Sequence, residues 1–171
     1  QYHFKKKTLK NLTHTLNPEI NPDDLVAGQV IRFPSFDGLS IPAILYKPNN
    51  IQKGDKLPAL LYIHGGPGGQ TRLNYTDRIQ YWVNHGYVVL AVNNRGSSGY
   101  GKTFYKADDL KHGDADLKDC IASKEFLINT GYVAADKIGI MGGSYGGYMV
   151  MAALAFAPDE FAVGVNYFGV T

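Results

Sequence analysis

The stretch Ile138-Gly139-Ile140-Met141-Gly142-Gly143-Ser144-Tyr145-Gly146-Gly147 joins two segments of different secondary structure. The apolar run 138–141 predicts a buried strand, and the longer apolar run 145–157, ended by Pro158, predicts a buried helix. Between them Ser144 is the serine of a GxSxG pattern. A serine at a sharp strand-to-helix turn is held in a strained backbone conformation that keeps its hydroxyl clear of the chain.

Ser144 is therefore a candidate nucleophile, and the N–H of Tyr145 at the start of the helix is a candidate donor to an oxyanion. The alternative is a glycine-rich packing turn in which Ser144 only caps the helix.

Outward from this turn, strand patterns alternate with helical ones, which predicts an α/β fold with a mostly parallel sheet covered by helices on both faces. The Asp37-Gly38 turn predicts an antiparallel hairpin at one edge of that sheet. We expect strands at 29–33, 41–47, 59–63, 87–92, 138–141 and 162–168, and helices at 75–85, 114–130 and 145–157. Asp114 is a candidate N-cap, and Gly86 and Gly131 stand where a helix end favours positive φ.

A second chemical signal is His64-Gly65-Gly66-Pro67, directly after the apolar run 59–63. An oxyanion hole needs a second backbone donor from a loop next to the nucleophile, and Gly66 is our candidate. His64 is expected to brace this loop rather than act as a general base. Arg95 is also expected to be structural, because its planar fork suits the bracing of its own turn by hydrogen bonds.

The segment Gly96 to Thr103 matches the GxxxxGK[ST] spacing of a phosphate-binding loop. A nucleotide site of that type also needs a magnesium-binding aspartate at the end of another apolar strand, and the runs at 138–141 and 162–168 end in glycine. The nucleotide-binding alternative is therefore disfavoured.

The composition excludes several classes of protein. A chain of 171 residues with 44% hydrophobic residues fits one domain, and a net charge of +2 with only a short Lys5-Lys6-Lys7 run argues against a nucleic-acid partner. A single cysteine, Cys120, rules out an internal disulfide and a multi-thiolate metal site, and is expected to pack in the core. We predict no metal and no cofactor. No apolar run is long enough to span a bilayer, so a soluble, cytoplasmic protein is favoured, although no segment identifies the compartment.

Four segments together resemble the prolyl oligopeptidase family of serine peptidases, and most closely its acylaminoacyl-peptidase and dipeptidyl-aminopeptidase-like branch. They are Asp37-Gly38, His64-Gly65-Gly66-Pro67, Asn94 to Gly101 and Gly142 to Gly147, in this order. The resemblance covers residues 29 to 171 and implies an α/β-hydrolase catalytic domain with Ser144 as nucleophile and the Tyr145 and Gly66 amides as the oxyanion hole. It also implies a preceding β-propeller that limits entry to short peptides.

The resemblance leads us to expect two parts in the chain. Residues 1–27 would be a linker or the tail of the propeller, and residues 28–171 the N-terminal part of the catalytic domain. In α/β-hydrolases the triad follows the order Ser, Asp or Glu, His, yet Ser144 is followed only by Asp159 and Glu160, which should point away from the turn, and by no histidine. We therefore expect the triad Asp and His beyond residue 171, and residues 162–168 to form an exposed apolar edge of an incomplete sheet that pairs with the rest of the domain or with another chain in a homo-oligomer.

The predicted function is hydrolysis of short peptides through an acyl-enzyme on Ser144. A carboxylesterase with the same turn is the nearest alternative, because fold and serine alone do not select amide over ester. A non-catalytic binding module that keeps the fold is an alternative from another class.

Overall fold

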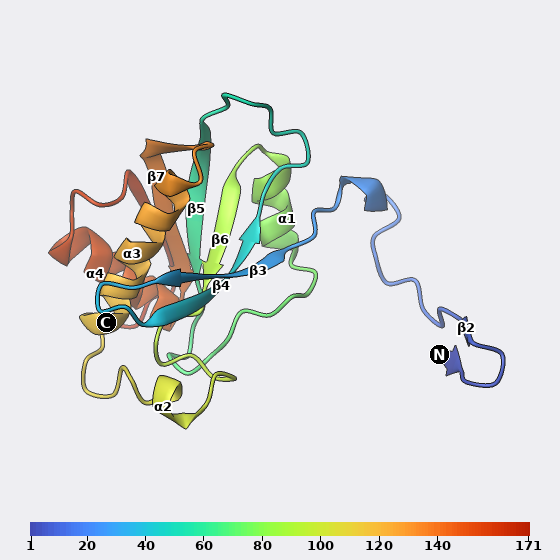
Figure 1. Ribbon diagram of the computed structural model, residues 1–171, viewed down its shortest axis with the longest axis horizontal. Coiled ribbons are helices and arrows are strands. Elements are labelled where there is room, and N and C mark those ends of the chain that lie inside the picture. Colours follow the sequence, from blue (N-terminus) through green and yellow to red (C-terminus); the bar gives the residue numbers. More distant parts are fainter.

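The computed structural model describes residues 1–171 and has a six-stranded sheet in the order β3-β4-β6-β5-β7-β8. Figure 1 shows the elements along the chain. The sheet strands are β3 (Gln29–Pro34), β4 (Ser40–Tyr46), β5 (Leu57–Ile63), β6 (Val88–Val92), β7 (Val133–Gly143) and β8 (Val163–Tyr167). The helices are α1 (Asp77–Asn84), α2 (Lys102–Tyr105), α3 (Ala115–Asn129) and α4 (Tyr145–Phe156).

The sheet is mostly parallel, as predicted. Strands β6, β5, β7 and β8 run parallel to one another, whereas β3 and β4 form an antiparallel hairpin at one edge. The hairpin turns at Gly38, whose φ of 81° explains why glycine follows Asp37 there. Strand β4 also pairs antiparallel with β6, which attaches the hairpin to the parallel strands.

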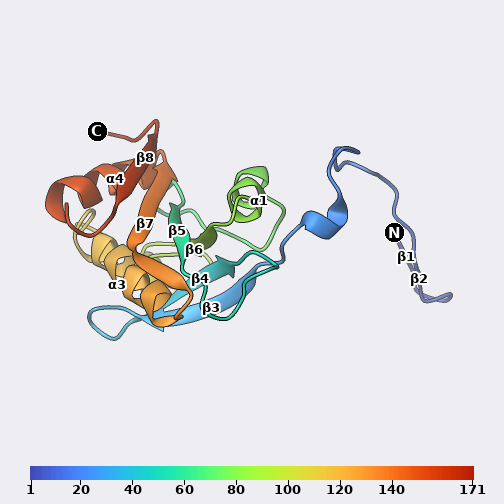
Figure 2. The same cartoon turned by 90° about the horizontal axis from the view of Figure 1, so that it is seen from above.

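Helices cover both faces of the sheet, so each face has its own apolar layer (Figure 2). On one face α1 places Ile79 and Val83 against β4 and β6, in a cluster with Val26, Ile44, Tyr46, Val89 and Ala91. On the other face α3 and α4 pack against the central strands. The apolar cluster on this face is the larger of the two. Its largest fully buried side chains include Phe33, Ile41, Leu61, Ile63, Leu90, Leu127, Ile138, Ile140 and Met149. Cys120 belongs to this second cluster and is fully buried, as predicted, and burial raises the pKa of its thiol.

Three features differ from the sequence predictions. Strand β7 begins at Val133, five residues early, because Val133 pairs with Leu57 of β5. The register then shifts, so that the next paired residue, Ile138, lies opposite Ala59. The short helix α2 was not expected. Helix α4 is not buried all round: Leu154 is 43% and Phe156 74% exposed, because α4 lies at the end of the layer and the chain places nothing over its outer side.

The helix ends are mostly as predicted. Gly86 and Gly131 follow α1 and α3 with φ of 86° and 83°. Asp114 is at the N-cap position of α3, but its side chain makes no capping hydrogen bond and instead pairs with Lys118 at 2.7 Å. The longest helix has 15 residues, and none combines the length and apolar character that a bilayer-spanning segment needs.

The N-terminal segment extends away from the sheet (Figures 1 and 2). It contains a small exposed hairpin of β1 (Tyr2–His3) and β2 (Thr8–Leu9) and a single 3₁₀ turn at Pro22–Asp24. It joins the body where Val26 exchanges two hydrogen bonds, of 2.9 and 2.8 Å, with the side chain of Gln80 in α1. Its assignment as a linker or the tail of a preceding domain stays a prediction.

Candidate active site

The turn between β7 and α4 holds Ser144 in a strained conformation. Its φ is 56° and its ψ is −120°, outside the regions that residues with a side chain favour. The residue is exposed, and its hydroxyl makes no capping hydrogen bond to the helix. The capping alternative is therefore wrong, and the hydroxyl is available to an external group.

Two glycines make the turn possible by allowing very close backbone contacts. A β-carbon on Gly142 would lie 2.5 Å from the carbonyl oxygen of Gly146, and one on Gly146 would lie 2.2 Å from that of Ile63. Both separations are far below van der Waals contact, so any larger residue would push α4 away from β5 and β7. The GxSxG pattern thus reflects the packing of a helix start directly onto two strand ends.

The backbone of Ser144 is also held by the segment at the end of β8. Its N–H donates to the Tyr167 carbonyl at 3.0 Å, and its carbonyl accepts from the N–H groups of Tyr148 at 3.1 Å and Val170 at 3.3 Å. These bonds fix the peptide groups on both sides of the strained residue. They leave its side chain without a partner.

The loop after β5 comes up beside this turn. The parallel register of β5 and β7 pairs Ile63 with Gly142, so Gly66 and Tyr145 each lie three residues past a paired position at the same end of the sheet. Gly65 is so near that a β-carbon on it would lie 3.2 Å from Cβ of Ser144. Neither the Gly66 nor the Tyr145 N–H donates a hydrogen bond within the chain. Both amides are free to donate to a ligand next to the serine.

His64 braces this loop, as predicted. One ring nitrogen, Nε2, lies 2.8 Å from the Ser97 hydroxyl in the loop after β6, and the other, Nδ1, lies 2.8 Å from the Gly65 carbonyl. Burial lowers the pKa of the imidazole, which favours its neutral form. A ring with both nitrogens occupied in this way is not positioned to accept a proton from Ser144.

Arg95 ties together three parts of the chain rather than its own turn alone. Its guanidinium pairs with Asp37 in the β3–β4 turn at 2.9 and 3.0 Å and with Asp119 in α3 at distances of 2.9 to 3.2 Å. Asp119 is fully buried and also accepts from the Ser35 hydroxyl at 2.5 Å and from the Arg95 N–H at 2.8 Å. The prediction of a structural role is confirmed, and the two carboxylates raise the pKa of the guanidinium further.

Sequence comparison decides the family. Residues 73–171, more than half of the chain, match the profile of the prolyl oligopeptidase family. The chain belongs to the prolyl oligopeptidase family. The resemblance inferred from the four sequence segments is thus confirmed.

Similar proteins in this family include several peptidases. The chain is 35% identical over 158 residues to dipeptidyl aminopeptidase BIII of Pseudoxanthomonas mexicana, covering 89% of this chain and 23% of that protein. It is 33% identical over 148 residues to human dipeptidyl peptidase 8, covering 83% of this chain and 16% of that protein. The chain therefore spans less than a quarter of the length of these two relatives.

Solved structures of family members share the fold. A puromycin-hydrolyzing peptidase of Mycobacterium tuberculosis superposes with a TM-score of 0.90 at 26% identity, over 99% of this chain and 27% of that one. The acylaminoacyl peptidase of Pyrococcus horikoshii superposes with a TM-score of 0.77 at 33% identity, over 85% of this chain and 23% of that one. The predicted fold class, an α/β-hydrolase domain of which the chain covers part, is confirmed.

In this member of the prolyl oligopeptidase family the segment Gly96 to Thr103, which matches the phosphate-loop pattern, forms a tight turn held by its own backbone. The N–H groups of Gly96, Ser97 and Ser98 donate to carbonyls of Phe104, Asn94 and Gly69. The helix that follows has only four residues, and Lys102 is exposed. Three amides of the segment are therefore engaged within the chain. A helix of only four residues does not provide the long helix start that follows a phosphate-binding loop, which disfavours the nucleotide-binding alternative.

None of the five histidines is hydrogen-bonded to Ser144. His64 is occupied as described, His85 lies on α1 against the Tyr81 carbonyl, and His112 contacts Tyr145 and Asp108. The acids that follow the serine are distant as well, because α4 separates them from the turn by about 18 Å of helix. Glu160 pairs there with Lys124 at 2.9 Å, as expected for an acid that points away from the nucleophile.

The side chain of Tyr145 makes a contact that the sequence pattern did not predict. Its hydroxyl donates to a carboxylate oxygen of Asp116 in α3 and lies 3.0 Å from Nδ1 of His112. Burial and the Asp116 carboxylate raise the pKa of the phenol, so it stays protonated. The side chain of the residue that follows Ser144 is therefore anchored to α3. Only the presence of polar residues at 108, 112 and 116 could have hinted at this.

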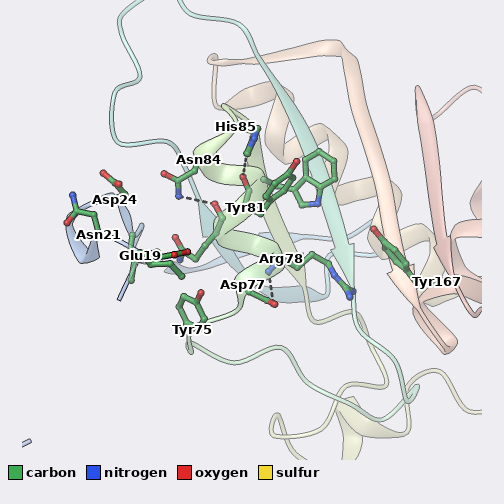
Figure 3. A pocket seen from close by; sticks show the side chains of 14 residues that line it. Glu19, Asn21, Asp24, Tyr75, Asp77, Arg78, Tyr81, Asn84, His85 and Tyr167 are labelled. Carbon is green, nitrogen blue, oxygen red and sulfur yellow. Dashed lines mark hydrogen bonds between the residues drawn. The ribbon is translucent and has the colours of Figure 1, made fainter. Parts of the chain in front are cut away.

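A pocket lies beside the turn rather than at Ser144. It has a volume of about 720 Å³ and is formed mainly by the segment 19–25 and α1 (Figure 3). Tyr167 lines it, with its ring 4.6 Å from the Arg78 guanidinium, while the Tyr167 carbonyl accepts the Ser144 N–H. The pocket thus comes near the turn without including the nucleophile. We assign the candidate site to the turn because the exposed, unpartnered hydroxyl of Ser144 and the unpartnered amides are there.

Proposed function

We propose that this chain carries the nucleophile and oxyanion-binding groups of a serine peptidase that hydrolyses short peptides. The observation that supports this most strongly is the exposed, unpartnered hydroxyl of Ser144 next to the unpartnered amides of Gly66 and Tyr145. The peptidase names of the relatives favour this activity over that of an esterase or a binding module.

In the proposed reaction the Ser144 oxygen attacks the carbonyl carbon of the scissile bond as its proton passes to a base. The carbonyl oxygen becomes an oxyanion that accepts hydrogen bonds from the Gly66 and Tyr145 N–H groups. Collapse of this intermediate breaks the C–N bond, and the leaving amine takes the proton from the base. Water then attacks the ester on Ser144 with the same base, which releases the acid and restores the hydroxyl.

The base and its orienting acid are proposed to lie in the part of the protein that follows residue 171, because no histidine within residues 1–171 contacts Ser144. The order Ser, Asp, His of α/β-hydrolases supports this placement. Residues 1–27 are proposed to connect residues 28–171 to a preceding β-propeller that restricts entry to short peptides. The outward course of this segment supports that connection (Figure 2).

The test is to label the purified full-length protein with a fluorophosphonate and to measure its turnover of aminoacyl anilides and short acyl esters. We expect Ser144 to be labelled, and Ser144→Ala to lose labelling and about 10⁶-fold in kcat, as the loss of a triad serine does elsewhere. Ser98→Ala, which removes a partly buried hydroxyl from a different loop, is the control and should keep both.

The outcomes separate the alternatives. Turnover of esters without anilides would replace the peptidase proposal with a carboxylesterase. Absence of labelling in the folded full-length protein would favour a non-catalytic binding module.

A further inference from the structure

A cluster of metal-ligating side chains lies behind the turn, on the α3 side of Tyr145. Asp108, His112 and Asp116 are spaced four residues apart in the segment that leads from α2 into the first turn of α3. One ligand atom from each lies within 4.8 Å of the others. Both carboxylates are buried, at 2% and 0% exposure, whereas the His112 side chain is 42% exposed.

Asp108 has no hydrogen-bonding partner for the oxygen that faces this cluster. Its Oδ2 is fully buried, accepts no hydrogen bond, and lies 3.3 Å from Nδ1 of His112. The carboxylate packs directly onto Gly96, where a β-carbon would lie 2.0 Å from Oδ2, so position 96 has room only for glycine. Burying a carboxylate without a partner is costly, and burial correspondingly raises its pKa. This buried oxygen therefore lies beside the His112 ring without a hydrogen-bond partner.

Asp116 is held in a fixed orientation by groups outside the cluster. Its Oδ1 accepts the backbone N–H groups of Gly113 at 2.8 Å and Leu117 at 2.9 Å. Its Oδ2 faces the cluster and accepts from the Tyr145 hydroxyl. No lysine or arginine pairs with either buried carboxylate, and the ion pair recorded for them is that of Asp108 Oδ2 with His112 at 3.3 Å, which carries positive charge only when the imidazole is protonated.

We propose that Asp108, His112 and Asp116 bind a divalent transition-metal ion, with Zn²⁺ as the preferred ion and Mn²⁺ as the alternative ion of the same site. Metal–ligand bonds of about 2.0 to 2.2 Å place neighbouring ligand atoms about 3.0 to 3.5 Å apart. The 3.3 Å between Asp108 Oδ2 and His112 Nδ1 already fits this spacing. Asp116 Oδ2 is the third ligand atom. It would bind the ion in place of the hydrogen bond that it now accepts from the Tyr145 hydroxyl. The exposed side of His112 provides an entry path and room for a water ligand.

The chemistry of the donors selects the ion. Two carboxylates and one imidazole suit Zn²⁺ or Mn²⁺, whereas copper(I) prefers thiolates, which the site lacks. A divalent cation neutralises the two buried carboxylates. This site is separate from Ser144 and would join the 106–113 segment to α3 and to Tyr145. It revises the prediction of no metal, which considered only thiolate ligands and did not bring the three residues together.

The test uses the purified full-length protein, stripped of metal with a chelator and titrated with ZnCl₂ and, separately, MnCl₂ in a calorimeter. We expect one equivalent of Zn²⁺ per chain and a rise in Tm on binding. His112→Ala changes a half-exposed side chain and should weaken Zn²⁺ binding by about tenfold or more. Asp108→Asn should weaken it similarly. Asp109→Asn, the exposed neighbour, is the matched control and should bind Zn²⁺ as the unchanged protein does.

The proposal is overturned if neither ion shows saturable binding. It is also overturned if His112→Ala and Asp109→Asn bind Zn²⁺ equally well. Because the readout is binding and not turnover, the result does not depend on whether Ser144 is catalytic. If Asp108→Asn fails to fold, the comparison of His112→Ala with Asp109→Asn still decides the question.

Discussion

At the residue scale the site depends on backbone contacts that exclude a side chain. Ser144 accepts a φ of 56° because the residues two positions before and after it have no β-carbon. Its strain is held by hydrogen bonds from Tyr148 and Val170 to its carbonyl and from its own N–H to Tyr167. These bonds hold the peptide groups around Ser144, and its hydroxyl makes no capping hydrogen bond to the helix.

Gly146→Ala should destabilise the protein although alanine is the better helix former. Helix propensity favours the substitution by about 1 kcal/mol. The added β-carbon, however, would lie 2.2 Å from the Ile63 carbonyl oxygen, and overpacking at a backbone contact costs about 3 kcal/mol or more. We expect the clash to dominate, as measured by urea denaturation of the full-length protein.

The control for this substitution is Gly54→Ala, at a glycine with φ of 98° and open space around it. It should cost only the backbone strain of about 1 to 2 kcal/mol. Equal or greater stability of Gly146→Ala relative to the unchanged protein would contradict the packing explanation of the GxSxG pattern.

At the element scale Arg95 holds the β3–β4 turn, the loop after β6 and α3 in one arrangement. The Arg95 guanidinium binds Asp37 on one side and Asp119 on the other, and the Phe36 ring lies 4.8 Å from its central carbon. The same loop after β6 contacts His64 through Ser97 and Asp108 through Gly96. One loop thus transmits the position of α3 to the loop that carries Gly66.

Arg95→Met should destabilise the protein by about 3 to 5 kcal/mol, because it leaves the fully buried Asp119 without its cation. Arg32→Met removes an exposed arginine from β3 and should cost less than about 1 kcal/mol. Chemical denaturation at pH 7 measures both. A loss no greater for Arg95→Met than for Arg32→Met would show that the fork does not stabilise the fold.

The stabilisation of the fold by the Asp37–Arg95 pair should depend on pH in the acid range. Hydrogen bonding to Arg95 lowers the pKa of Asp37 in the folded protein below the ordinary aspartate value of about 3.9. A lowered folded pKa means that the stabilisation is present above the unfolded pKa and disappears as the pH falls through the folded pKa. Asp37→Asn should therefore be less stable at pH 7 and equally stable below the folded pKa.

The expected difference at pH 7 is below about 1 kcal/mol, because the Asp37 side chain is 39% exposed and solvent screens the pair. Urea midpoints of both proteins from pH 7 to pH 2 provide the measurement. A stability difference that grows on acidification would have the wrong sign and would refute this account.

At the scale of the whole molecule the two edges of the sheet differ. The β3 edge belongs to an antiparallel hairpin that carries exposed polar side chains such as Gln29 and Arg32. At the β8 edge Val163 is 52% and Phe168 95% exposed, and the neighbouring α4 exposes 74% of Phe156. An apolar edge strand pairs readily with other chains. The expected exposed edge at residues 162–168 is therefore present.

Residues 1–171 expressed alone should associate through this edge. Light scattering is expected to show oligomers or aggregates at micromolar concentration. Phe156→Glu combined with Phe168→Glu should reduce the association, because it places charge on the apolar surface. A single charge at the other edge, Val30→Glu, is the control and should leave the association unaltered. A stable monomer of unmodified residues 1–171 would contradict the prediction.

Sequence predictions succeeded where a feature depends on residues close together in the chain and failed where it depends on contacts between distant segments. Strands with unbroken apolar runs, such as 88–92, and turns with positive φ, such as Gly38 and Gly131, were predicted because periodicity and backbone sterics are local properties. The first half of β7 was missed because its pairing with β5, and not its own composition, makes it a strand. Asp114 was predicted to be an N-cap from its position alone. In the structure its carboxylate pairs instead with Lys118, which lies one helical turn further along α3.

The sequence by itself determined the strand-to-helix turn around Ser144, the alternating α/β order and the family, because each depends on residues that are neighbours along the chain or on their spacing. Only the tertiary structure decided the partners of Arg95, which are 58 and 24 residues away, the anchoring of Tyr145 by Asp116, and the gathering of Asp108, His112 and Asp116. These depend on how α3 packs against the sheet. Contacts between distant segments arise when separate apolar faces are buried together, and a local pattern does not encode which polar groups then meet.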